Sequence, residues 1–114
     1  MCIIGAIHSV VFCRFAANKL AVCIDDAHPE AILSASCGIE PGRVIAYKPL
    51  IDAAINLATH KPEFVVVHRR EQLSAELREG RDFDWRAFQE GAEPASCVFV
   101  KVNHPAYILY TSGT

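Results

Sequence analysis

The sequence predicts an α/β fold, part of a mostly parallel sheet with flanking helices. Apolar segments typical of strands alternate with amphipathic segments typical of helices, in the order strand, helix, strand, loop, helix, strand. This alternation is characteristic of β-α-β units, in which a helix joins two parallel strands. The 114 residues contain no internal repeat and no long linker, so they form one small domain or part of a larger one.

The predicted strands are short segments rich in branched and aromatic residues. Residues 64–67, Phe-Val-Val-Val, give the clearest strand, and residues 106–110 form an apolar run that we expect to be buried on both faces. Residues 44–47 are expected to be extended, and residues 97–102 to form an extended apolar piece at a sheet edge. The remaining predicted strands are residues 7–12 and 31–36.

Three segments are predicted to be helical. Residues 16–27 place apolar side chains three and four residues apart, and Pro29 ends the helix. Pro49 suits the first position of a second helix that continues to residue 58, with one face formed by Leu50, Ala54, Leu57 and Ala58. A short third helix follows Asp84, which can cap it, with Trp85 and Phe88 inward and Gly91 at its end.

Composition excludes several classes of protein. The hydrophobic content of 52% and the charged fraction of 21% indicate a buried core rather than disorder. A net charge of −2 gives no electrostatic basis for binding nucleic acid or an anionic membrane. The five cysteines are odd in number and lack C-x-x-C spacing, which argues against disulfides and zinc and favours a reducing compartment. We expect a cytoplasmic location, with the mitochondrial matrix as the alternative.

Two charged pairs are interpreted as structural rather than functional. Asp25-Asp26 is expected to be a solvated helix end, not a metal or acid–base pair. Arg69-Arg70 is expected to be a solvated strand end. The five histidines show no H-E-x-x-H or other ligand spacing, so no metal site is predicted.

The carboxyl ends of the predicted strands are the expected place for a ligand. The loop at residues 38–43, the Arg69-Arg70 pair and the final residues Thr111, Ser112, Gly113 and Thr114 all follow predicted strands. Gly113 permits close approach of the backbone, and successive N–H groups with hydroxyls can line an anion site. The same residue types also form ordinary surface turns, and the Walker spacing is absent.

Several motifs resemble one enzyme superfamily. Residues 107–114, Y-I-L-Y-T-S-G-T, resemble the first half of the phosphate loop of the adenylate-forming (AMP-binding) enzymes. Residues 5–12, 24–29, 36–43, 47–50, 60–62 and 80–85 resemble, in order, segments of short-chain acyl-CoA synthetases, most of all the propionate–CoA ligase type. One departure is Cys13-Arg14, where the family has two glycines.

The resemblance implies that residues 1–114 are a single partial domain, a fragment of the large N-terminal domain. It assigns Thr111, Ser112, Gly113 and Thr114 to the ATP phosphates. It assigns Glu40, Pro41, Gly42 and Arg43 to the coenzyme A phosphates, although Glu40 stands where relatives have another arginine.

The implied reaction activates propionate through an acyl-adenylate and transfers it to coenzyme A, with ATP and Mg²⁺. The implied partners are therefore a small carboxylate, ATP and coenzyme A, with no nucleic acid and no membrane. No catalytic residue and no metal ligand fall within the chain, so this fragment is expected to be inactive alone. The alternative is a non-catalytic α/β module that binds a nucleotide or a partner protein.

Overall fold

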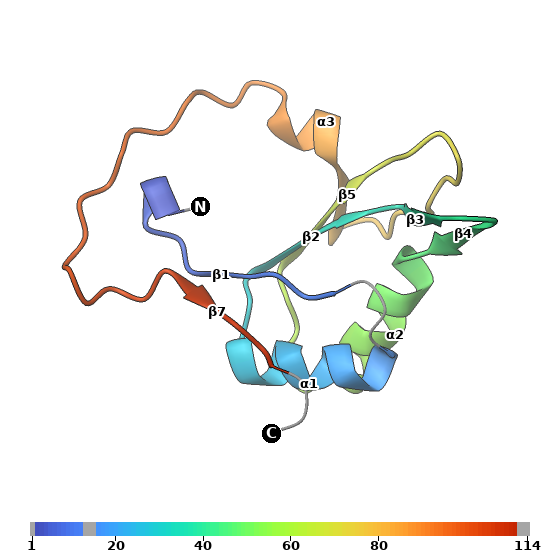
Figure 1. Cartoon of the computed structure of the whole chain (residues 1–114). Helices are drawn as coiled ribbons and strands as arrows, with labels where there is room; N and C mark the ends of the chain where they lie inside the picture. The colour runs from blue at the N-terminus through green and yellow to red at the C-terminus, as the bar shows by residue number, and fades with distance from the viewer. Residues whose placement is uncertain (1, 13–15, 112–114) are drawn as a thin grey trace.

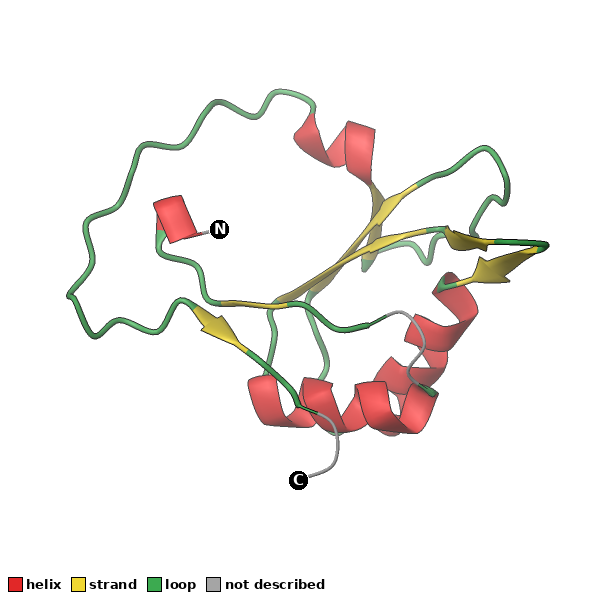
Figure 2. Cartoon of the chain, in the orientation of Figure 1, coloured by secondary structure: helices red, strands yellow, loops and turns green. Residues whose placement is uncertain are grey.

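The computed structural model describes residues 2–12 and 16–111. Helices and strands alternate over most of this range, and a long coil joins the last helix to the last strand (Figures 1 and 2). In chain order the elements are the 3-10 helix Cys2–Ile4, β1 (His8–Ser9), α1 (Ala17–Ala27), β2 (Ala31–Ala35), β3 (Cys37–Glu40), β4 (Arg43–Ala46), α2 (Lys48–Leu57), β5 (Phe64–His68), β6 (Asp82–Asp84), α3 (Trp85–Gln89) and β7 (Tyr107–Ile108).

A three-stranded parallel sheet in the order β2-β5-β6 forms the centre of the fold. Strand β5 is the middle strand, and Val65, Val66 and Val67 are all buried, as a strand covered on both faces requires. The prediction of a parallel α/β arrangement is therefore confirmed, as are the strands at residues 31–36 and 64–67. Strand β6 was not predicted, because two of its three residues are aspartates, which strands disfavour.

Helices α1 and α2 pack on each other and against the same face of the sheet (Figure 1). The core between these layers contains Ala21 and Ile24 of α1, Ile51, Ala54 and Ile55 of α2, Ala58, and Val65 and Val67 of β5. Helix α1 ends where predicted. His28 adopts a left-handed conformation there (φ 48°), donates its N–H to Ile24 O, and is followed by Pro29.

The predicted orientation of α2 is partly wrong. The helix begins at Lys48, one residue before Pro49, and its buried face contains Lys48, Ile51, Ala54 and Ile55. Leu57, which was predicted to face inward, is 63% exposed. A prediction from the sequence pattern assumes that a lysine is exposed, whereas Lys48 is buried here and forms ion pairs. Burial of Lys48 fixes which face of the helix is turned toward the sheet.

Residues 37–43 form a hairpin rather than the predicted loop. Strands β3 and β4 pair antiparallel, with Glu40 opposite Arg43 across the two-residue turn Pro41-Gly42. Proline presets the first turn position, and Gly42 has the positive φ of 78° that its place in the turn requires. The extended conformation predicted for residues 44–47 is confirmed for β4.

The last predicted strand differs most from expectation. Only Tyr107 and Ile108 form a strand, β7, which pairs in parallel with β1 in a separate two-stranded sheet. Tyr107 and Leu109 are 63% and 68% exposed, so burial on both faces is wrong for this structure. The reason is that β1 is the only strand beside β7 within residues 2–12 and 16–111.

Residues 97–102, predicted as an edge strand, lie in the long coil, and Phe99 is almost fully exposed. Strand β1 is limited to two of the six residues predicted at 7–12. Cys13 and Arg14, where the sequence departs from the family glycines, lie outside the described residues. Within the described ranges, no helix has the length and apolar character needed to cross a membrane.

Helix α3 begins as predicted. The Asp84 carboxylate caps it by accepting hydrogen bonds from the backbone N–H groups of Arg86 and Ala87, at 3.0 and 3.2 Å. Phe88 is half exposed rather than buried, but its ring contacts those of Phe64 and Phe83. The helix therefore contacts the sheet through aromatic rings instead of closing a core over it.

Candidate functional site

The tip of the β3–β4 hairpin holds the residues assigned by resemblance to coenzyme A. Glu40 and Arg43 form an ion pair across the turn, with Arg43 Nη2 and Nε at 2.7 and 2.8 Å from Glu40 Oε2. The side chain of Arg43 is 64% exposed, whereas that of Glu40 is 20% exposed. The tip therefore presents one accessible guanidinium whose charge is already balanced by a carboxylate.

The base of the hairpin is fixed to the central sheet. Tyr47 donates its N–H to Ser36 O at 3.1 Å, and Arg70 donates its N–H to Ser36 Oγ at 2.9 Å. Gly38 is buried against Tyr47, and a Cβ at this position would collide with the hydroxyl group and ring of Tyr47. These contacts hold the hairpin as a rigid extension of β2, projecting from the carboxyl ends of the strands (Figure 1).

A buried charge network lies behind the hairpin and was not predicted from the sequence. Lys48 Nζ lies 2.6 Å from Asp82 Oδ2 and 2.7 Å from Asp52 Oδ2, and Arg81 Nε lies 2.6 Å from Asp82 Oδ1. Arg81 also reaches Asp52. Four charged side chains from α2 and the start of β6 thus form one connected group that ties the helix to the sheet.

The environment of Asp82 favours its charged form. Burial by itself raises the pKa of this carboxyl group, but hydrogen bonds from Arg81, Lys48 and the backbone N–H of Arg78 outweigh burial and lower the pKa to about 2. The i,i+4 spacing of Lys48 and Asp52 and the adjacent Arg81-Asp82 were visible in the sequence. The contact between these two pairs depends on the fold.

The structure places the start of the predicted ATP loop beside α1. Tyr110 Oη donates to Asp26 Oδ2 at 2.8 Å and to Cys23 O at 3.3 Å. Burial, together with the neighbouring Asp26 carboxylate, raises the pKa of Tyr110 to about 12. Thr111 is exposed, and Ser112, Gly113 and Thr114 lie outside the described residues.

The described parts of the three features that follow predicted strands lie in two places in the fold. The hairpin and Arg69-Arg70 follow the carboxyl ends of β2 and β5. Tyr110 instead contacts the C-terminal end of α1, which leads into the amino end of β2 (Figure 1). Tyr110 and Thr111 thus follow a strand of the separate two-stranded sheet, because β7 pairs with β1 and not with the central sheet.

The two pairs interpreted as structural have defined partners. Arg69 is half exposed and lies 3.1 Å from Asp84 Oδ2, which confirms a solvated strand end. Asp25-Asp26 is not simply solvated, because Asp25 Oδ1 accepts the N–H of His60 at 2.8 Å and Asp26 accepts from Tyr110. Across residues 2–12 and 16–111, no three His, Cys, Asp or Glu side chains are grouped so that they could hold a metal ion.

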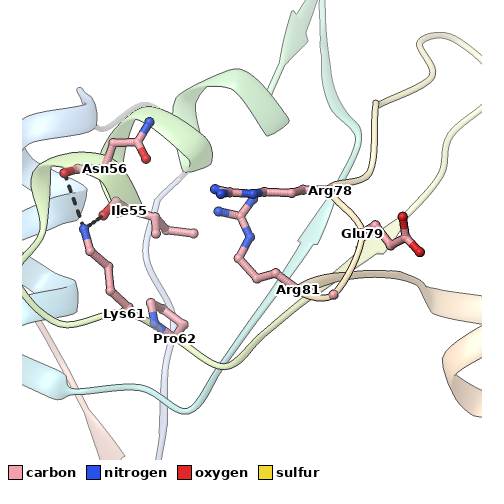
Figure 3. A pocket seen from close by; sticks show the side chains of 8 residues that line it. Ile55, Asn56, Lys61, Pro62, Arg78, Glu79 and Arg81 are labelled. Carbon is pink, nitrogen blue, oxygen red and sulfur yellow. Dashed lines mark hydrogen bonds between the residues drawn. The ribbon is translucent and has the colours of Figure 1, made fainter.

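An open cleft of about 500 Å³ lies between α2 and the turn that precedes β6 (Figure 3). Three of its side chains carry positive charge, namely Lys61, Arg78 and Arg81, and Glu79 is its acidic residue. No motif in the sequence pointed to this cleft, because its two walls are about twenty residues apart in the chain and neither has a recognisable ligand spacing.

Comparison with known proteins gives a consistent set of relatives, although no family model matches the chain. The chain is 53% identical over 111 residues to an uncharacterized protein of Pseudomonas aeruginosa. It is 45% identical over 112 residues to the mitochondrial acyl-CoA synthetase short-chain family member 3 of Homo sapiens, and 42% identical over 114 residues to propionate–CoA ligase of Escherichia coli. These matches cover 97% of this chain but only 16–18% of each relative.

Proposed function

Because this chain is homologous over 97% of its length to a segment of short-chain acyl-CoA synthetases and propionate–CoA ligases, we propose that it is part of an AMP-forming acid–thiol ligase acting on propionate. The identity of 42–45% to these relatives is the observation that carries the proposal. We assign the chain to the large N-terminal domain of such an enzyme. A cytoplasmic location, or a mitochondrial one as in the name of the human relative, accompanies this proposal.

The proposed reaction has two steps. The propionate carboxylate attacks the α-phosphorus of ATP, which forms propionyl-adenylate and releases pyrophosphate. The thiol of coenzyme A, as its thiolate, then attacks the acyl carbon and releases AMP. We assign no catalytic residue to these 114 residues, so the chain contributes binding of the phosphate groups rather than chemistry at the acyl carbon.

The hairpin tip is the proposed contact for the phosphates of coenzyme A. Arg43 has an exposed guanidinium, whose fixed set of N–H donors suits bidentate binding of phosphate. The rigid base at Ser36 and Tyr47 holds this group at a set position outside the sheet. Glu40 competes for the same guanidinium, so we infer that phosphate binding here exchanges one anionic partner of Arg43 for another.

The loop that starts at Thr111 is the proposed contact for the ATP phosphates. Support comes from the exposed position of Thr111 and from the hydrogen bond of the preceding Tyr110 to Asp26, which anchors the start of the loop. Among the described residues, no three His, Cys, Asp or Glu side chains are grouped so that they could hold Mg²⁺.

Substitution of Arg43 in the protein that carries this sequence tests the proposal. Arg43→Glu is expected to raise the KM for coenzyme A about tenfold or more and to leave propionate-dependent ATP–pyrophosphate exchange nearly unchanged. Arg86→Glu is the matched control, because Arg86 is also exposed, on α3, and far along the chain from the hairpin.

The KM for coenzyme A and the ATP–pyrophosphate exchange distinguish a wrong assignment of the hairpin from a wrong assignment of the reaction. An unchanged KM for coenzyme A in Arg43→Glu would refute the role of the hairpin. Absence of propionate-dependent exchange in the unmodified protein would refute the ligase itself, and retained nucleotide binding would then favour the non-catalytic module.

A further inference from the structure

The cleft beside α2 has an uneven distribution of charge that the proposed ligase does not use. One wall comes from the end of α2 and the residues after it, Ile55, Asn56, Lys61 and Pro62, and the other from residues 78–81. In Figure 3 the side chains of Arg78 and Arg81 reach across the cleft toward α2, whereas Glu79 points away from it. The charged groups directed into the cleft are therefore cationic.

Lys61 removes a feature that would otherwise repel an anion. The C-terminal end of a helix carries partial negative charge from its unpaired carbonyl groups. Lys61 Nζ donates to three of these carbonyl oxygens, those of Ile55 at 2.5 Å, Ala58 at 2.6 Å and Asn56 at 3.4 Å. The negative end of α2 is thus covered by an ammonium group where it borders the cleft.

The two arginines differ in how their donors are used. Arg81 directs Nε and Nη2 to Asp82 and Asp52, and the structure records no bond from Nη1 within the described part of the chain. Arg78 donates its backbone N–H to Asp82 Oδ2 at 2.7 Å, which fixes its position beside Arg81. Its guanidinium has no hydrogen bond or ion pair to any residue in 2–12 or 16–111.

We propose that this cleft is an anion site that binds the phosphate group of a small organic phosphate, held between Arg78 and the outer donors of Arg81. The Arg78 guanidinium presents paired donors that match phosphate oxygens and brings an unpaired positive charge. Arg81 contributes N–H donors, because its own charge is already shared with Asp82 and Asp52. The volume of about 500 Å³ exceeds that of a phosphate group and lies in the range of small-molecule sites. Ile55 and Pro62 give the remainder of the ligand an apolar surface.

This site is separate from the Glu40–Arg43 tip and the Thr111 loop, and it does not depend on the proposed ligase activity. Arg78 is the residue to change, because its exposed side chain is not part of the buried Lys48–Asp82 network. Its backbone bond to Asp82 is retained by any substitution except proline. Arg86 again provides the control, since its guanidinium is exposed and has no partner within the described residues.

Binding of inorganic phosphate by equilibrium dialysis tests the inference, in the longest natural form of the protein that contains these 114 residues. Arg78→Gln is expected to weaken one phosphate site per chain at least tenfold, Arg78→Lys to weaken it less, and Arg86→Gln to leave it unchanged. A binding curve for Arg78→Gln that superimposes on that of the unmodified protein overturns the proposal. Equal losses in Arg78→Gln and Arg86→Gln also overturn it, because they indicate general charge attraction rather than a site.

Discussion

Replacing Asp82 with asparagine tests whether the buried charge network holds α2 against the sheet. The Asp82 side chain is fully buried, and it accepts from Lys48 and Arg81 at 2.6 Å each. Asparagine keeps the shape but removes the negative charge. Lys48, which is only 4% exposed, would then be left with Asp52 alone.

Two estimates give the size of the effect. Lowering the pKa of a carboxyl group from 3.8 to about 2 corresponds to about 2 kcal/mol of stability at neutral pH. Removing one partner from a buried ion pair typically costs about 3–5 kcal/mol, because the other charge stays buried. We therefore expect Asp82→Asn to lower the free energy of unfolding by about 3 kcal/mol, enough to unfold much of a marginally stable chain.

The stability difference between the unmodified chain and Asp82→Asn should depend on pH. The folded-state pKa of Asp82 is lowered, so its stabilisation is present above pH 3.8 and is lost as the pH falls toward 2. The difference between the unmodified chain and Asp82→Asn should therefore shrink over that range. Fluorescence of Trp85, the single tryptophan, reports unfolding in urea, and exposed Glu93→Gln is the control. A difference below about 0.5 kcal/mol at pH 7, or one that persists at pH 2, would refute the reasoning.

Three further predictions follow from local geometry. Gly38→Ala should lower stability by about 1–3 kcal/mol, because the added Cβ meets the Tyr47 ring, and a second change, Tyr47→Ala, should recover part of the loss in a thermal melt. Asp84→Ala should lower the free energy of unfolding by about 1 kcal/mol, because it removes the cap of α3. Asp84→Asn should keep most of that stability, and equal losses in the two variants would contradict a capping role. Tyr110 has a pKa raised to about 12, so stability should fall between pH 10 and pH 12 as the unfolded state ionises first. Asp26→Asn should lower that pKa in an absorbance titration, and no change would exclude the hydrogen bond as its cause.

Elements whose formation depends on residues close together in the sequence were predicted well. The apolar run of β5 and the amphipathic spacing of α1 identified these elements, and their alternation gave the parallel sheet. Strand β6 could not be predicted from the residues Asp-Phe-Asp, because the partners of both aspartates lie outside the strand. Asp82 pairs with Lys48, which is distant in the chain, and Asp84 accepts from Arg86 in the next helix. The rotation of α2 depends in the same way on the contact of Lys48 with Asp82.

Prediction of the candidate site was limited by the same dependence on distant contacts. The Glu40–Arg43 tip was identified as a candidate from resemblance, but its ion pair requires the hairpin that pairs these two residues. The cleft at Arg78 and Arg81 is formed by segments with no shared motif. For Ser112, Gly113 and Thr114 the assignment to ATP stays a prediction.

The pairing of β1 with β7 has a consequence for the order of folding. This pair joins residues about 99 positions apart, as the bond from Ser9 Oγ to Ile108 O shows. Only two residues of each strand contribute to the pairing, so few hydrogen bonds offset the chain entropy that is lost when the segment after α3 becomes ordered. We infer that this small sheet forms last and separates first, so the segment leading to Thr111 can detach while the core around Val65 and Val67 remains folded.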